Sequence, residues 1–459
     1  MSSYQGLGRL TDADVWVRAN ARPILTDPRS RRASVASKHA FRITLAALAV
    51  ICVAALSYFA ALRPVDFPVY HYAARNMLSR TGPMYGPQSG IGWPQVYRYP
   101  PLFLLLFTPL ALLPLRVAAI IWAALKFAAL GLFARALFSR LRIYGHGFQF
   151  LSLLPALPYL AVEFHYGNVQ FFVFVLVGAA FLCLKKRPSL AAFALALAAG
   201  IKVWPLFFVP YLVARKRTAV AGLTLALTVL LTLLPAGYFG WRTNASLLHQ
   251  WADQELGVAS TAGEPGLVGF PSQSLHSVLM RFFVSLNYAE LTDSNYPKLN
   301  LGKVDPRAVE VLWLLLAATG YVGLLLLARR AKSNDLTVHA VAFCALLLLQ
   351  PFTQIGDLVI LFLPIAVAVA ALRDDSDLPG WTRAALYTAM ALMVLKPLVP
   401  DRNAQRLLQV LGVDFAATSL LAAGLIAKCL RNPRRAMIAM PQEDLVTSLQ
   451  IVSRAASDR

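Results

Sequence analysis

The sequence has few charged residues. Asp, Glu, Lys and Arg make up 14% of 459 residues, while 58% are hydrophobic and the mean hydropathy is +0.59. A soluble chain of this size carries about a quarter charged residues. The deficit is concentrated in long apolar runs, which is typical of a protein that crosses the membrane many times. A soluble globular enzyme is therefore excluded.

Cysteine is also scarce, and the familiar signatures of several protein classes are missing. The four cysteines lie inside apolar segments without metal-ligand spacing, which favours small buried hydrophobic residues over a disulfide framework or a metal site. No Walker motif, GxGxxG, HExxH or Cys/His cluster occurs, so ATP-driven transport and zinc proteolysis lose their usual support. We expect no metal and no cofactor. The cysteines are Cys52, Cys183, Cys344 and Cys429.

What the sequence has in excess is positive charge, with a formal net charge of +21. The basic residues cluster at the ends of apolar runs, as in loops on the cytoplasmic side of a membrane. This pattern indicates topology and contact with anionic lipids, and not a nucleic-acid partner. The clusters are Arg140/Arg142, Lys185–Arg187, Arg215–Arg217, Arg329/Arg330/Lys332 and Arg431/Arg434/Arg435.

The order of apolar runs predicts an all-α polytopic membrane protein with about 10–12 transmembrane helices and short helices in its outward loops. Residues 1–40 form a basic cytoplasmic arm without a cleavable signal peptide, and residues 431–459 form a cytoplasmic tail. The transmembrane domain covers residues 41–430, with outward loops at 63–101 and 239–308. Two runs are interrupted, by Pro109 and by Gly200/Lys202/Pro205, and each could be a broken or re-entrant helix.

A single acid, Asp66, follows the first apolar run. Its carboxylate could cap a short helix, or it could act as a general base whose pKa is raised by apolar and aromatic neighbours. The same loop contains His71 and ends in YRYPP, which contains Tyr97, Arg98 and Tyr99. These side chains could form an aromatic belt at the membrane surface or contact a substrate.

Lys202 stands alone in the apolar stretch LAAGIKVWPLFFVP. An isolated lysine there costs about 2.5–3.5 kcal/mol, so it either reaches the interface or has a partner, such as a substrate phosphate. HYGNVQ places His165, Asn168 and Gln170 beside a span, as hydrogen-bonding groups for sugar hydroxyls or as a helix cap.

The long outward loop contains Gln273, His276 and Arg281 at spacings that place them on roughly one helix face. That face could contact substrate or pack a loop helix against the bundle. Farther along, Asp357 enters an apolar run, and helix capping is its simplest role.

Taken in order, these motifs resemble a known family. An outward acid after the first span, YRYPP, GNVQ, IKVWP and QSL with an arginine six residues on resemble the bacterial glycosyltransferases of family 87 between residues of about 41 and 400. That family has the GT-C fold and includes polyprenol-phosphate-mannose-dependent alpha-1,2-mannosyltransferases of mycobacteria. One departure is PFTQIGD in the late outward loop, where Gly356 and Asp357 stand in place of expected histidines.

The resemblance implies an enzyme of the bacterial plasma membrane whose active site faces the extracytoplasmic side. It would transfer a sugar, mannose by the resemblance, from a polyprenyl-phosphate donor to a hydroxyl of a lipid-linked or glycan acceptor, with inversion. Asp66 would be the base. Lys202, Arg98 and Arg281 would stabilise the phosphate, helped by His165 or His276. His71, Tyr97, Tyr99, Asn168, Gln170 and Gln273 complete the predicted substrate-binding set.

Two other functions fit the same composition. A lipid-linked sugar flippase would bind and move the substrate without chemistry, and a structural subunit of an envelope-synthesis complex would tolerate alanine at Asp66, Lys202 and Arg281. The large asymmetric outward loops and the lack of visible internal repeats favour the enzyme.

Overall fold

The structure is a computed structural model that describes residues 50–89, 95–260, 272–285, 297, 299, 301–330 and 336–431. Its contacts divide the chain into Met1–Leu56 and Ser57–Arg459. The description below concerns the second unit, apart from the helix Val50–Ala61, which begins in the first. The predicted arm at 1–40 lies outside the described residues, as does the predicted tail beyond 431.

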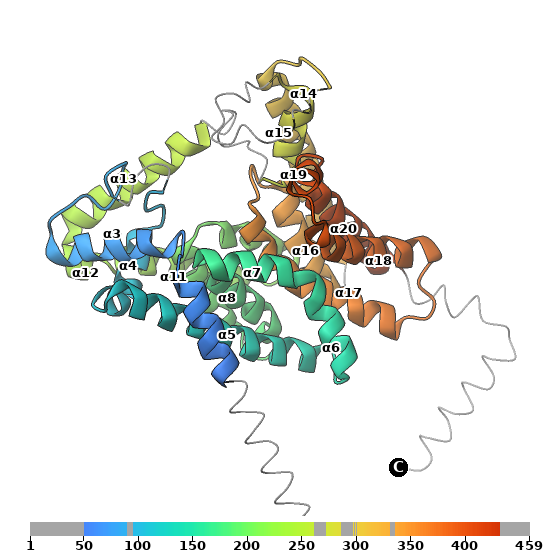
Figure 1. Cartoon of the computed structure of the whole chain (residues 1–459), viewed down its shortest axis with the longest axis horizontal. Coiled ribbons are helices and arrows are strands. Elements are labelled where there is room, and N and C mark those ends of the chain that lie inside the picture. Colours follow the sequence, from blue (N-terminus) through green and yellow to red (C-terminus); the bar gives the residue numbers. More distant parts are fainter. Residues whose placement is uncertain are drawn as a thin grey trace, which may run out of the picture. The chain divides into compact units, whose positions relative to one another are not determined.

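The described residues form helices and no β-strands, which confirms the predicted all-α class (Figure 1). From α3 to α12 the bounds are α3 Phe67–Ser79, α4 Pro101–Ala111, α5 Leu115–Arg140, α6 His146–Leu153, η1 Leu154–Ala156, α7 Leu157–Tyr166, α8 Gln170–Cys183, α9 Pro188–Ile201, η2 Trp204–Phe207, α10 Phe208–Ala214, α11 Thr218–Leu233 and α12 Ala236–Phe239. The remaining helices are α13 Trp241–Ser260, α14 Leu275–Phe283, α15 Pro306–Arg330, α16 Leu336–Leu349, η4 Ile355–Leu361, α17 Phe362–Asp374, α18 Gly380–Leu395, η5 Lys396–Leu398, α19 Arg402–Val410 and α20 Val413–Leu430.

Several helices are apolar on surfaces that the protein itself leaves uncovered. On α11 and α15, Leu230 is 61% exposed and Leu315 62% exposed, and such surfaces are stable in contact with lipid. The chain is thus a polytopic membrane protein. Six segments of the described chain are long and apolar enough to span a bilayer: Leu115–Arg140, His146–Tyr166, Thr218–Phe239, Pro306–Arg330, Ile355–Asp374 and Val413–Leu430. Shorter apolar helices accompany them.

The interrupted apolar run between 189 and 213 is a broken helix, as its sequence indicated. Helix α9 ends at Ile201, Lys202 has extended backbone angles, and the chain resumes as η2 and α10. The other interrupted run forms α4, which contains Pro109 and ends at Ala111. The break at Lys202 leaves its side chain at a helix end, away from the middle of a continuous span.

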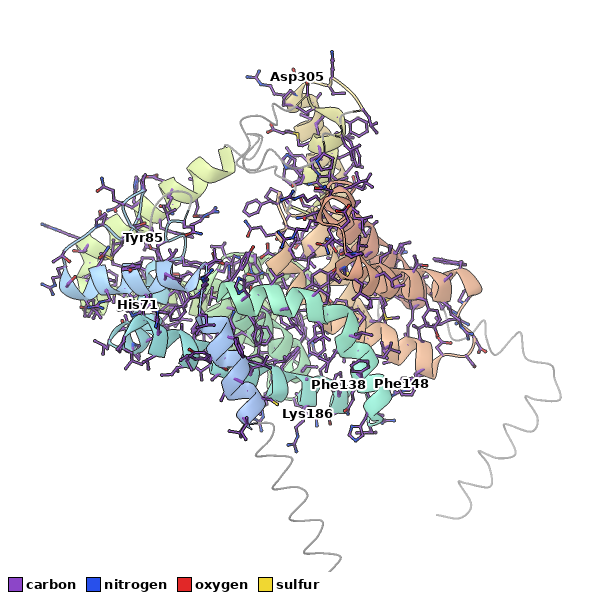
Figure 2. All side chains as sticks on the ribbon, viewed as in Figure 1. His71, Tyr85, Phe138, Phe148, Lys186 and Asp305 are labelled. Carbon is purple, nitrogen blue, oxygen red and sulfur yellow. The ribbon has the colours of Figure 1, made fainter. Side chains whose placement is uncertain are left out.

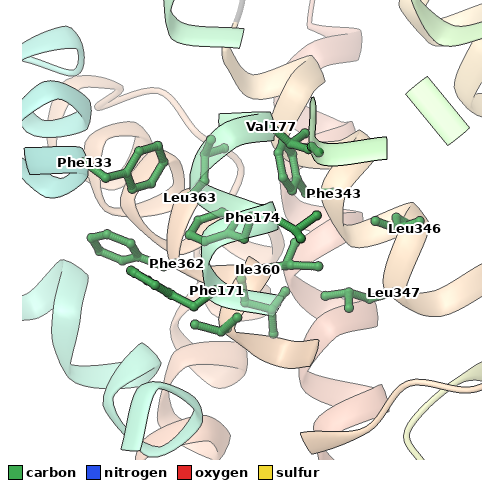
Figure 3. Packing of buried hydrophobic residues seen from close by; sticks show 14 of the residues in the cluster. Phe133, Phe171, Phe174, Val177, Phe343, Leu346, Leu347, Ile360, Phe362 and Leu363 are labelled. Atoms are coloured by element: carbon green, nitrogen blue, oxygen red, sulfur yellow. The ribbon is translucent and has the colours of Figure 1, made fainter. Parts of the chain in front are cut away.

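The core is built around α8 (Figure 3). The ring of Phe174 packs 5.1 Å from that of Phe133 on α5 and 6.1 Å from that of Phe343 on α16. Gly178 allows a close approach, because a Cβ there would lie 2.6 Å from the Phe133 ring. This packing fixes the position of α8, and with it the polar turn that precedes Gln170.

The basic clusters from separate loops meet at one end of these helices. Arg140, Lys185 and Arg217 line one small hollow, and Arg140 also lines a second hollow with Arg142 and Lys428. In Figure 2, Lys186 and Asp305 lie at opposite ends of the view. Separate loops thus bring their positive charge to the same end, as expected of loops on one side of a membrane.

All four cysteines are free, in agreement with the absence of a disulfide framework. Their predicted burial holds fully for Cys344 alone. Cys183 and Cys429 are partly buried, and Cys52 is exposed in this structure.

Candidate active site

The turn between α7 and α8 brings together a first group of polar side chains, Asp66, Asn168, Gln170, Lys202 and Asp357. Helix α7 ends at Tyr166 and is capped by Gly167, whose φ of +70° is in the left-handed region that favours glycine. A Cβ on Gly167 would also lie 2.8 Å from the Cβ of Phe67, so the turn packs directly against the start of α3. The backbone N–H of Asp66 donates to the carbonyl of Tyr166 at 2.8 Å. Asp66 is thereby held beside Asn168.

Asp66 occupies the N-cap position of α3, but its side chain makes no capping hydrogen bond. Its Oδ2 instead accepts a hydrogen bond of 2.8 Å from Nδ2 of Asn168. The amide of Asn168 is oriented by two donors to its Oδ1, the backbone N–H of Gln170 at 2.9 Å and the hydroxyl of Tyr99 at 3.4 Å. Of the two interpretations of Asp66, side-chain capping is not observed.

Lys202 lies at the other end of the same group. Its Nζ donates to Oε1 of Gln170 at 2.9 Å and lies 3.6 Å from Oδ1 of Asp357. Gln170 Oε1 also accepts from the indole of Trp204 at 3.1 Å. Because a lysine ammonium has three N–H groups, one remains for a ligand at this partly exposed position. Asp357 also forms the predicted cap, since its Oδ2 accepts from the backbone N–H of Gln354.

The result is a connected series from Asp66 through Asn168 and Gln170 to Lys202 and Asp357. It joins one carboxylate and one ammonium through two neutral amides. Burial raises the pKa of Asp66 above its usual value, although the Asn168 hydrogen bond and the charges of Lys202 and Lys126 act to lower it. A carboxyl with a raised pKa is a better proton acceptor at neutral pH than an ordinary aspartate.

Within the YRYPP segment, Arg98 and Tyr97 bind neighbouring protein groups. Arg98 makes a bidentate ion pair with Glu255 of α13, with both N–O distances at 3.0 Å. Gln254, also on α13, donates to the carbonyl of Tyr97 and accepts from the backbone N–H of Gly86. The hydroxyl of Tyr97 donates to the carbonyl of Pro100 at 3.2 Å. These contacts attach α13 to the first loop.

The two remaining histidines near the first group have separate surroundings. His71, labelled on α3 in Figure 2, is buried, and its Nε2 lies 2.9 Å from the carbonyl of Leu113. His165 is exposed and makes no hydrogen bond with the described residues; its ring contacts Tyr166. Neither ring is hydrogen-bonded to Asp66 or Lys202.

Gln273, His276 and Arg281 form a second buried group around α14, which packs against α15 and α16. Gln273 donates two hydrogen bonds. Its backbone N–H donates to the Thr353 carbonyl at 2.7 Å, and its Nε2 donates to the Gln409 carbonyl at 2.9 Å. His276 Nδ1 lies 3.1 Å from the Pro351 carbonyl. Burial lowers the pKa of His276, which keeps the ring neutral at pH 7.

Arg281 donates to two buried backbone carbonyls, those of Ser272 at 2.6 Å and Val410 at 3.3 Å. We therefore expect Arg281→Ala to lower the free energy of unfolding by about 3 kcal/mol, because each buried acceptor left without its donor costs about 1–3 kcal/mol. Chemical denaturation in detergent, followed by tryptophan fluorescence, measures this. The exposed Arg402→Ala is the control, and equal stability of the two variants contradicts the expectation.

Sequence reasoning missed several residues that support this arrangement. Lys126 and Glu163 form a buried ion pair of 3.1 Å behind the α7–α8 turn, and Glu255 pairs with Arg98. Lys126 and Glu163 left a signal, since each is a charge within or directly beside an apolar run. The pairing of Lys202 with Asp357 spans 155 positions and left no local signal. The described residues contain no group of three or more His, Cys, Asp or Glu placed to hold a metal ion.

The comparison with protein families identifies the chain. The sequence model of glycosyltransferase family 87 matches residues 97–351, which is more than half of the chain. The chain belongs to glycosyltransferase family 87. The earlier resemblance is thereby confirmed, and this membrane protein is a glycosyltransferase. No curated protein and no solved structure matches it.

The family 87 match covers only part of the first polar group. Asn168, Gln170 and Lys202 lie inside the matched residues, whereas Asp66 and Asp357 lie outside them. The α7–α8 turn belongs to the matched part, and the structure brings the two acids to it from before and after that part.

Proposed function

We propose that this glycosyltransferase moves a sugar, mannose by the resemblance, from a polyprenyl-phosphate donor to a hydroxyl of a lipid-linked or glycan acceptor. The observation that carries the proposal is the hydrogen-bonded connection between a carboxylate and an ammonium, Asp66 and Lys202, through Asn168 and Gln170. A glycosyl transfer from a phosphate needs a proton acceptor at the nucleophile and a positive charge at the leaving group.

In this reaction Asp66 takes the proton of the acceptor hydroxyl on a carboxylate oxygen. The acceptor oxygen forms a bond to the anomeric carbon as the bond from that carbon to the phosphate oxygen breaks, with inversion. Polyprenyl phosphate leaves with the bonding electrons, and Lys202 stabilises the charge that develops on it. Asn168 holds Asp66, while Gln170 and Asp357 hold the Lys202 ammonium in place.

The remaining predicted site residues support this group. Tyr99 orients the Asn168 amide. Arg98, with Glu255, attaches α13 beside the first loop. Tyr97 donates to the Pro100 carbonyl and His71 contacts the Leu113 carbonyl, whereas His165 is exposed on α7. Gln273 and His276 contact the Thr353 and Pro351 carbonyls in the segment that leads to Asp357, and Arg281 binds the Ser272 carbonyl next to Gln273. In the proposal Lys202 acts on the phosphate directly, and the two arginines act through the loops they fix.

We place this reaction on the extracytoplasmic side of the bacterial plasma membrane. Support comes from the two ends of one helix, α8. Helix α8 begins at Gln170 and ends beside the hollow lined by Lys185 and Arg217. Since basic loops are retained in the cytoplasm, the end that bears Gln170 then faces outward.

The proposed base gives a pH dependence. A base must be ionised, and the pKa of Asp66 is raised above 3.8. We therefore expect kcat/KM to rise with pH through the raised pKa of Asp66 and then to level off, so that activity is lost on the acid side. A kcat/KM profile from pH 4 to pH 8 at fixed ionic strength measures this. A flat profile across that interval contradicts it.

The decisive experiment uses the purified full-length protein in nanodiscs with labelled polyprenyl-phosphate mannose and a lipid extract of the source cell. Labelled product identified by mass spectrometry supports the proposal, and parallel donors carrying other sugars test the choice of mannose. Translocation of the donor in proteoliposomes without any product instead indicates a flippase.

A further inference from the structure

A buried ion pair, Lys126 with Glu163, lies behind the proposed site. The side chains of Lys126 on α5 and Glu163 on α7 are 0% and 1% exposed. Both belong to segments apolar enough to span a membrane. Removing two charges from water is costly, and a well-packed apolar pair would often be as stable. Stability alone therefore does not account for the pair, and its contacts indicate what it does.

The contacts of the pair join the two sides of the α7–α8 turn. Lys126 Nζ donates to the backbone carbonyl of Glu163 at 2.8 Å and to its Oε1 at 3.1 Å. The same Oε1 accepts the backbone N–H of Phe171 at 2.9 Å. Glu163 precedes the turn and Phe171 follows it at the start of α8, where a carboxylate stabilises free N–H groups. The pair therefore closes the turn across its base.

Neighbouring contacts show that this turn is held from two further directions. Trp122, one helical turn before Lys126 on α5, donates its indole N–H to the Gly167 carbonyl at 2.8 Å. On the opposite side of Glu163, a Cβ on Gly356 would lie 3.3 Å from its Oε2. The segment that carries Asp357 therefore also packs against this carboxylate.

The front of the turn carries the groups that contact the proposed reacting residues. Between Glu163 and Phe171, the Tyr166 carbonyl binds the N–H of Asp66, Asn168 binds its carboxylate, and Gln170 binds Lys202. A change at the back of so short a turn must move these three groups at the front.

We propose that Lys126 and Glu163 are positioning residues for glycosyl transfer, which hold the α7–α8 turn so that Asn168 faces Asp66 and Gln170 faces Lys202. This inference rests on the proposed function. It assigns the pair no contact with substrate. The pair acts through the two amides, and its loss misplaces the base and the ammonium relative to each other.

The charges of the pair also provide a signature that simple packing lacks. The positive charge of Lys126 lowers the pKa of Asp66, and that of Lys202 does so more strongly, whereas the charge of Asp357 raises it. The titratable groups that interact with Asp66 from the elements around it are Lys126 on α5, Glu163 on α7, Lys202 after α9, Asp357 in η4, and the tyrosines Tyr70 on α3 and Tyr99 before α4.

The test compares Lys126→Met, Glu163→Gln and the double variant in the full-length protein. We expect each single substitution to lower kcat about 10- to 100-fold with a smaller change in KM, since a small misplacement of reacting groups has effects of that size. The acid limb of kcat/KM should move to higher pH in Lys126→Met, which loses a cation near Asp66. It should move to lower pH in Glu163→Gln, which leaves that cation uncompensated. The double variant should recover part of kcat.

Asp414→Asn is the matched control. Asp414, on α20, is a buried acid that pairs with Lys396 and accepts a hydrogen bond from Tyr159, which lies on α7 as Glu163 does. It should lower the thermal midpoint without moving the acid limb. Hydrogen exchange of the peptide covering 163–171 gives a readout that needs no activity, and faster exchange is expected in Glu163→Gln. An acid limb that stays in place in both single variants overturns the inference, as does unchanged exchange at the turn. If the wild type transfers no sugar, the proposed function is overturned. Hydrogen exchange at residues 163–171 then still tests whether the pair holds the turn.

Discussion

Asp66→Asn should lower kcat for glycosyl transfer about 10²–10⁴-fold, because a general base contributes about that much. Asparagine has nearly the same shape as aspartate but cannot take up the acceptor proton. The amide can still meet Asn168, which holds Asp66 through Oδ2 at 2.8 Å. Initial rates with labelled donor and saturating acceptor measure the loss, and donor binding to the variant should persist.

The same variant should be as stable as the wild type or slightly more stable. Burial raises the pKa of Asp66, so the folded state binds a proton more readily than the unfolded state does. As pH rises from the unfolded pKa through the folded one, ionisation of this group therefore removes stability, and a neutral asparagine avoids that loss at pH 7. Thermal unfolding at pH 7 in detergent tests the direction.

Asp401→Asn provides the matched control for Asp66→Asn. Asp401 is also an N-cap aspartate, but its carboxylate accepts the capping bonds from Asn403 and Ala404. Asparagine caps helices about as well as aspartate, so this variant should keep both stability and transfer. Full activity in Asp66→Asn would remove Asp66 from the mechanism.

The class of fold could be predicted because its cause is local in the sequence. Apolar runs of span length and basic residues at their ends depend only on neighbouring residues, and the break at Lys202 followed from a charge between a glycine and a proline. The partners of the charged side chains could not be predicted in this way. Arg98 pairs with Glu255, 157 positions away, and no period or spacing in the sequence marks that pair.

The candidate site was predicted in parts. The motif GNVQ drew attention to Asn168 and Gln170 as hydrogen-bonding groups, but hydrogen bonds to Asp66 and Lys202 depend on how α3, α8 and α9 pack together. For Arg281 the sequence left two roles open. An arginine in a predicted outward loop could equally meet a phosphate or buried carbonyls, and only the packing of α14 shows that it binds the carbonyls of Ser272 and Val410.

The second large effect is expected at Lys202. Lys202→Met keeps an unbranched side chain of nearly the same length and removes its charge, so in the proposed reaction the phosphate of the leaving group would lose a fixed cation. We expect kcat to fall about 10²–10³-fold, the usual effect of losing one group that stabilises transition-state charge. Affinity for the product polyprenyl phosphate should fall as well, whereas the acceptor KM should stay near its wild-type value. Steady-state kinetics with product inhibition separate these quantities.

Two further variants, Lys202→Arg and Lys396→Met, show whether the loss of kcat in Lys202→Met comes from the lost charge or from altered packing. Arginine keeps the charge but replaces a compact ammonium by a planar fork, so it should recover activity only in part at a position shaped by Gln170 and Asp357. Lys396→Met breaks another lysine–aspartate pair, with Asp414, and should leave donor kinetics unchanged. Since the Lys202 charge also lowers the pKa of Asp66, Lys202→Met should move the acid limb of kcat/KM to higher pH. A variant that loses acceptor affinity while product inhibition and the acid limb stay unchanged would place Lys202 at the acceptor, away from the phosphate.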